Sequence, residues 1–186
     1  MRKFWGFAEA GQFTDIVDRY YLKFGLLLTK ITRKEKTGNM KNIIRAAGKG
    51  TTNVAEALAK KADEQLVKTA VKFYREVGKG KAFAEFSKPG SRFTFRTLYV
   101  FVIDRQGVVL AHGQNKNLIG KVLIGLKDSD GKLFIKQIID TAKVKKNGWI
   151  EYKWLNNITN RITPKQTYFQ REGDYIFGGG ITKISK

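Results

Sequence analysis

The chain has 186 residues, a formal net charge of +20 and a pI near 10.1, and 42% of its residues are hydrophobic. The absence of cysteine excludes disulfides, thiolate metal sites and a cysteine nucleophile, and a single histidine, His112, excludes histidine-based zinc sites within one chain. The sequence shows no pairing of a nucleophile with a base, so we expect neither an enzyme nor a cofactor.

The basic excess is spread along the chain, and its densest runs are Arg33–Lys36 and Lys143–Lys146. Such a charge attracts anions, including nucleic acid and acidic surfaces. No helix-turn-helix, zinc-finger or aromatic RNA-binding pattern accompanies it. Two interpretations stay open: solvated lysine-rich faces, or a basic module that binds nucleic acid or an acidic surface.

Residues 1–52 are predicted to form a basic N-terminal extension with an amphipathic helix, serving as a linker or lying near a membrane. Within residues 15–31, Ile16, Tyr20 and Phe24 recur at helical spacing, and basic residues follow. The helix would pack on the main domain or lie on an acidic membrane surface. The uncharged run of residues 24–29 is shorter than a membrane span or the apolar part of a secretion signal.

Residues 53–186 are predicted to form one domain that begins with a long helix. From Leu58 to Val77, apolar residues recur at steps of three or four, and Gly78 and Gly80 end the pattern. A short helix over residues 81–87 would turn Phe83 and Phe86 inward.

The remaining pattern is mostly typical of strands. Residues 98–104 and 108–112 form a predicted hairpin, and residues 113–131 read as a loop with a short helix. A helix capped by Asp130 follows over residues 132–144, and three strands close the chain, over residues 149–154, 165–171 and 175–184. The order predicts an α+β fold in which a five-stranded antiparallel sheet carries the long helix on one face.

Several motifs then occur in a fixed order over about residues 55–184. They are Val77–Phe86, Leu98–Asp104, Gly107–Gly113, Leu118–Lys121, Leu126–Lys132, Gly148–Trp154, Pro164–Lys165 and Gly178–Ile181. Together they resemble a single Cache domain. The resemblance departs at Leu155–Asn157, where a proline usually follows the last tryptophan, and at Thr182, where tyrosine is expected.

The resemblance implies a PAS-like sensor fold on the periplasmic or extracytoplasmic side of a membrane, although the sequence has no recognisable secretion signal. Such domains bind small molecules, often short carboxylates, in chemoreceptors and sensor kinases. We therefore expect a small organic anion as ligand and a signalling protein as partner, with a homodimer and membrane proximity through residues 1–50 as further expectations. The alternative function is that of a basic module that binds nucleic acid or an acidic surface through its net charge of +20.

The predicted ligand-binding residues lie on the strands. Alternation places Tyr152 and Trp154 on one face, where they are either pocket walls or core. Lys165 would supply the positive charge. Tyr168 would help to wall the pocket only if Lys165 belongs to a loop, because strict alternation places the two on opposite faces.

The two other predicted ligand-binding residues are Tyr99 on the first strand and His112 at the end of the second. A pKa near the usual ~6.5 for His112 would make binding of an anion depend on pH. The ligand would lie between the sheet and the segment Gly113–Gly131. Within that segment, Asp128–Gly131 favours a turn over a calcium loop, and the glycines 178–180 favour close approach of another element.

Overall fold

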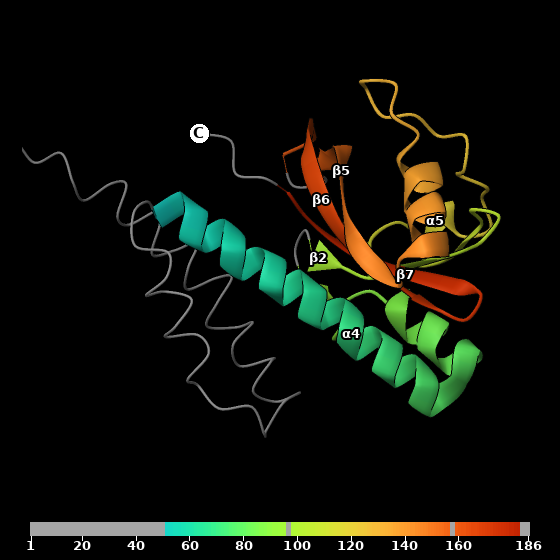
Figure 1. Cartoon of the computed structure of the whole chain (residues 1–186). Helices are drawn as coiled ribbons and strands as arrows, with labels where there is room; N and C mark the ends of the chain where they lie inside the picture. Colours follow the sequence, from blue (N-terminus) through green and yellow to red (C-terminus); the bar gives the residue numbers. More distant parts are fainter. Residues whose placement is uncertain (1–50, 96–97, 157–158, 183–186) are drawn as a thin grey trace, which may run out of the picture. The chain divides into compact units, whose positions relative to one another are not determined.

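The computed structural model describes residues 51–95, 98–156 and 159–182 (Figure 1). The predicted extension over residues 1–52 and its amphipathic helix therefore lie outside the described residues, apart from Thr51 and Thr52, which begin the first described helix. Whether the extension is a linker or lies near a membrane stays a prediction.

Ten helices and strands follow one another in the described residues. In chain order they are α4 (Thr51–Phe86), β1 (Thr94–Phe95), β2 (Leu98–Tyr99), β3 (Phe101–Asp104), β4 (Val109–His112), the 3-10 helix η2 (Lys116–Leu118), α5 (Phe134–Val144), β5 (Asn147–Asn156), β6 (Arg161–Glu172) and β7 (Tyr175–Thr182). The main sheet is antiparallel with the strand order β4-β3-β7-β6-β5, and β1 pairs with β2 separately. The predicted α+β, PAS-like fold is confirmed.

The long helix ends where the sequence predicted. Gly78 has φ of 78° and ψ of 170°, so α4 is two helices joined at a kink. A positive φ costs glycine little, and the chain turns there before the short second helix, drawn in green in Figure 1. Phe83 and Phe86 on that second helix are buried, as expected, and pack against Phe177 of β7 at ring-centroid distances of 6.3 and 6.2 Å.

The sheet is covered on both faces. On one face α4 lies against β7, where the ring of Tyr74 is 5.2 Å from that of Phe177. On the other face α5 (Figure 1) presents Phe134, Ile135, Ile138, Ile139 and Ala142, all buried, as its spacing predicted. Burying one such large side chain contributes roughly 1.5–3 kcal/mol, so these layers hold the fold together.

Three details differ from the prediction. The strand predicted over residues 98–104 is divided at Val100, because β2 pairs with β1 and only β3 joins the main sheet. Asp130 does not cap α5: that position belongs to Leu133, and Asp130 instead pairs with Lys153 at 2.8 Å. Strands β5 and β6 also start earlier and end later than their apolar alternation indicated, whereas β7 begins at Tyr175 as predicted and is described to Thr182.

Candidate functional site

Lys165 lies well inside β6 and is only 4% exposed, so it is a strand residue and not a loop residue. Alternation places it on the same face as Thr167 and Phe169, and Phe169 belongs to the core that packs on α5. A lysine is almost never this deeply buried without a partner. The position therefore needs a chemical explanation.

The partner that the structure gives Lys165 is a tyrosine. The Nζ atom of Lys165 donates a hydrogen bond of 2.8 Å to the hydroxyl oxygen of Tyr99 and lies 4.1 Å from the centroid of the Tyr99 ring. Burial lowers the pKa of Lys165, while Tyr152 and Asp63 act in the opposite direction. Because burial disfavours the charged form, a negative group beside Nζ would stabilise it.

Tyr152 and Trp154 surround this pair in different ways. The ring of Tyr152 stacks on Phe134 at 4.1 Å, and its hydroxyl shares a 2.9 Å hydrogen bond with Thr167. Tyr152 is therefore core, with its polar end turned toward the Lys165 side of the sheet. Burial raises the pKa of the Tyr99 hydroxyl, and a hydrogen bond from the half-buried Trp154 side chain opposes that shift.

A small cavity of about 10 Å³ adjoins Lys165. It is lined by strand residues and by Gln114 of the loop after β4; the lining residues are Tyr99, Gln114, Trp154, Leu155, Asn156, Lys165 and Thr182. This volume has room for about one water molecule, and acetate needs several times more. The pocket is thus nearly closed, and only Gln114 comes from the segment that was expected to cover it.

A larger hollow, of about 380 Å³, lies on the outer surface of α5. It is a shallow depression open to solvent, lined by Leu133, Lys136, Gln137, Asp140, Thr141 and Val144. Specific small-molecule sites are enclosed and carry a few polar groups aimed at the ligand. Size alone would favour this hollow, but the buried lysine favours the smaller cavity as the functional site.

His112 lies beside Tyr99, with 4.7 Å between their ring centroids. Its Nδ1 accepts hydrogen bonds from the backbone N–H groups of Asn115 at 2.9 Å and Gln114 at 3.2 Å. These bonds place the proton of the neutral ring on Nε2. Burial, followed by the nearby charge of Lys165, lowers the pKa of His112 to about 3. The expected value near 6.5 is therefore wrong, and His112 stays neutral at ordinary pH.

Tyr168 lies on the other face of the sheet. Its ring is 5.4 Å from that of Trp149, which in turn lies under the ammonium group of Lys60 on α4. The structure therefore brings together five of the six predicted site residues, namely Tyr99, His112, Tyr152, Trp154 and Lys165. It places Tyr168 apart from them, as strict alternation from Lys165 requires.

Asp63 on α4 is a buried charged residue that was not among the predicted site residues. It is fully buried, its Oδ2 accepts a 3.3 Å hydrogen bond from the backbone N–H of Tyr168, and its Oδ1 has no hydrogen-bond partner among the described residues. Burial raises the pKa of Asp63 to about 8, although the Tyr168 N–H and Lys165 act against the shift. An acid four residues before Val67, within the apolar face of a helix, was the available signal.

Among the described residues, no cluster of three or more histidine, aspartate or glutamate side chains could hold a metal ion. Nor is any described helix long and apolar enough to cross a membrane.

The family model for single Cache domain 2 matches residues 27–179, so the chain belongs to the single Cache domain family. Single Cache domains are sensory ligand-binding domains, extracytoplasmic or periplasmic, and do not form an enzyme family. The resemblance inferred from the ordered motifs is confirmed.

Two solved structures of similar fold are those of a chemotaxis protein and of a chemosensory domain. A methyl-accepting chemotaxis protein from Vibrio parahaemolyticus is 22% identical over 76% of this chain and 96% of its own, with a TM-score of 0.60. A Cache chemosensory domain whose structure was described for carboxylic acid recognition is 22% identical over 73% of this chain and 100% of its own, also with a TM-score of 0.60. At this identity the likeness shows the fold alone. No curated protein matches the chain.

Proposed function

We propose that this domain is a non-enzymatic sensor that binds a short carboxylate at Lys165 and acts through a partner signalling protein on the extracytoplasmic side of a membrane. The observation that carries the proposal is the buried ammonium group of Lys165, which donates to the neutral hydroxyl of Tyr99 at the wall of a small cavity. The neighbour solved for carboxylic acid recognition supports the choice of ligand class.

The chemistry of the site fits a small anion better than a neutral molecule. Among the described residues Lys165 has no anionic hydrogen-bond partner, which leaves much of the desolvation cost of its burial uncompensated. A carboxylate oxygen at Nζ would form a charge-assisted hydrogen bond, roughly twice as strong as a neutral one. The indole N–H of Trp154 and the hydroxyl of Tyr99 supply further donors, and the core around Phe134 excludes water.

Binding requires the cavity to open. A volume of about 10 Å³ admits no carboxylate, so side chains at its rim must move. The half-buried Trp154 and the 43%-exposed Leu155 are the large rim residues with room to do so. The acid would take the place of the Tyr99 hydroxyl as acceptor for Lys165, and the open state would be selected because only it binds the acid.

A melting experiment on the full chain tests the proposal. Formate, acetate, propionate, lactate and pyruvate are added separately, and the melting temperature is followed against concentration. A ligand at about 100 times its Kd stabilises the folded state by about 2.7 kcal/mol, which gives a clear rise. Lys165→Met should abolish the rise, whereas Lys145→Met, the same change at an exposed lysine, should retain it.

Either of two results would overturn the proposal: no rise with any of the five acids, or an equal rise in the Lys165→Met protein. The same pair of variants tests the alternative, nucleic-acid binding. Of the two lysines only Lys145 is exposed, so a surface interaction driven by release of counterions should weaken in Lys145→Met and not in Lys165→Met, and it should fall steeply as salt rises. Such a result, without a response to the acids, would favour the basic-module interpretation.

A further inference from the structure

Asp63 and Lys165 are the two charged side chains buried in the described part of the chain, and a single strand separates them. Each is close to β7, at adjacent glycines. A Cβ added to Gly179 would lie 2.2 Å from Oδ1 of Asp63 and 3.0 Å from a methyl carbon of Val67. A Cβ added to Gly180 would lie 2.3 Å from Cε of Lys165.

Adjacent residues of a strand point to opposite faces. Asp63 therefore packs on β7 from the α4 face, and Lys165 packs on it from the face of the proposed site. Because both contacts are made at glycines, no side chain of β7 stands between the carboxyl group and the ammonium group. With the low dielectric of the interior, the two charges act on each other through the sheet, and each shifts the titration of the other.

We propose that Asp63 is the counter-charge of Lys165 across the sheet, and that a carboxylate bound at Lys165 drives a proton from solvent onto Asp63. The inference rests on the proposed function, because it concerns what happens when that site is filled. Asp63 would be a positioning residue that acts through Lys165 and does not touch the acid.

Charge balance supports the step. Above the pKa of about 8 for Asp63 this side chain is ionised, and with Lys165 protonated the buried pair is neutral. A monocarboxylate brings one negative charge into the same interior, and uptake of one proton by Asp63 restores neutrality. Since an unbalanced buried charge is costly, the doubly negative arrangement is disfavoured. Binding of the carboxylate at Lys165 thereby changes the charge of Asp63 on α4, on the far side of the sheet.

Other titratable groups also act on Asp63. On α4 itself Glu64 raises its pKa, and on β6 Lys165 and the backbone N–H of Tyr168 lower it. The hydroxyls of Tyr152 on β5 and Tyr99 on β2 interact electrostatically with Asp63 and have raised pKa values, primarily through their own burial, so they stay protonated. Of the charged groups, only Lys165 belongs to the site that the acid would occupy.

Infrared difference spectroscopy observes the proton directly, because a protonated carboxyl group absorbs apart from a carboxylate. The full chain is measured with and without acetate at a pH of about 8.5, just above the pKa of about 8 for Asp63. We expect a new protonated-carboxyl band on acetate addition. The band should be absent in Asp63→Asn and retained in Glu64→Gln, which makes the same change at the next residue. Calorimetry under the same conditions reports whether acetate binds at all.

The outcomes separate the two proposals. Acetate binding without a new band, or with a band that persists in Asp63→Asn, overturns the inference and leaves the proposed function intact. Acetate that does not bind contradicts the proposed function for this acid, and the coupling is then tested without ligand. In the free protein, Lys165→Met should raise the midpoint at which the Asp63 band titrates by about one pH unit, because a nearby positive charge is lost. An unchanged midpoint overturns the inference in either case.

Discussion

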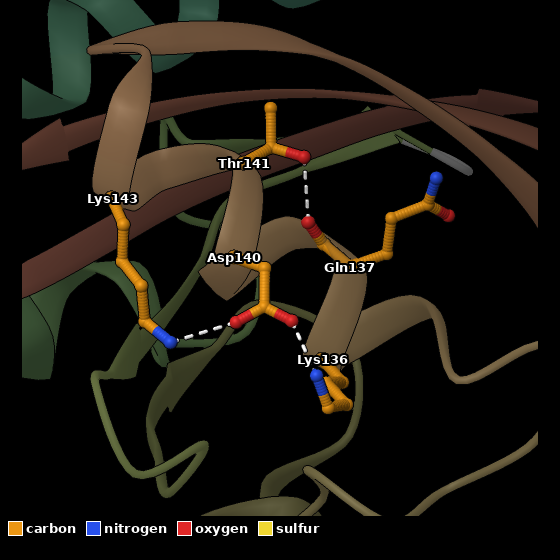
Figure 2. A network of polar contacts seen from close by, with 5 residues as sticks. All are labelled: Lys136, Gln137, Asp140, Thr141 and Lys143. Carbon is orange, nitrogen blue, oxygen red and sulfur yellow. Dashed lines mark hydrogen bonds and ion pairs between the residues drawn. The ribbon is translucent and has the colours of Figure 1, made fainter.

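Two groups of charged side chains in this domain differ in what controls their titration. On the outer surface of α5, Asp140 pairs with Lys136 and with Lys143 (Figure 2), and hydrogen bonds from Lys136 first and Lys143 second lower the pKa of Asp140 to about 2. At the sheet, burial dominates: it raises the pKa of Asp63 and lowers that of Lys165. Hydrogen-bond partners thus determine the pKa of Asp140, whereas desolvation dominates the pKa shifts of Asp63 and Lys165.

The difference decides which group can bind a ligand specifically. Exposed ion pairs are already satisfied, are screened by salt and contribute little to stability. The pair of Asp63 and Lys165 carries a desolvation cost that an added anion can relieve at Lys165. A ligand therefore gains more by reaching Lys165 than by joining the lysines of α5, even though the α5 surface has the larger hollow.

The largest effect on stability is expected at Gly180 of β7, against which the buried Lys165 packs. In Gly180→Ala the new methyl group would lie 2.3 Å from Cε of Lys165 and 2.6 Å from Oγ1 of Thr167, so one of them must move. Overpacking of this kind costs about 1–3 kcal/mol, and we also expect the response to carboxylates to be lost. Urea unfolding measures the first effect, and melting with added acids measures the second.

Gly125→Ala is the matched control, since Gly125 is exposed, has nothing within 4 Å of an added Cβ and shows no positive φ. Its unfolding free energy should change by less than about 0.5 kcal/mol. Equal stability of the two variants would contradict the tight packing of Lys165 on β7.

A smaller effect on stability is expected from His112, which is buried beside Tyr99 and is neutral. Its folded pKa of about 3 lies below the unfolded value of 6.5, so only the unfolded chain binds this proton between them. Its contribution to stability is complete above pH 6.5 and is lost as the pH falls toward 3, with a slope of at most about 1.4 kcal/mol per pH unit.

His112→Asn removes the titration and leaves a side-chain oxygen that can accept the backbone N–H groups. Unfolding free energies of both proteins are compared between pH about 6.5 and pH about 5, above the range in which ordinary carboxyl groups titrate. The variant should lose less stability over this interval. Parallel curves would show that His112 titrates normally.

The smallest effect is expected on the surface of α5. Asp140→Asn removes the carboxylate shared by Lys136 and Lys143, but all three side chains are substantially exposed. We expect a change in melting temperature within the reproducibility of the measurement, and any residual change should vanish at high salt. A loss as large as that of Gly180→Ala would contradict the distinction between the two groups.

Much of the fold was predictable from the sequence, because apolar periodicity reports which face of an element is buried. The spacing of apolar residues from Phe134 to Ala142 marked the buried face of α5, and Gly78 marked the kink of α4. Strand ends were less predictable. Arg161 and Asn156 are polar and not buried, and they pair through backbone hydrogen bonds that leave no hydrophobic pattern.

The site was predictable only along single strands. Alternation correctly placed Tyr152 with Trp154 and separated Tyr168 from Lys165. Asp63 was missed because its relation to Lys165 passes through the sheet at Gly179 and Gly180, a contact between segments more than 100 positions apart in the chain. The closed state of the cavity depends on the packing of Trp154 and Leu155, which periodicity does not fix.

Binding of a carboxylate at Lys165 is tested most directly by a crystal structure of the domain grown with the acid that raises its melting temperature most. We predict a carboxylate oxygen within hydrogen-bonding distance of Lys165 Nζ, with the rim at Trp154 and Leu155 displaced to make room. An acid bound elsewhere, with Lys165 still donating to Tyr99 and the cavity unchanged, would contradict this prediction.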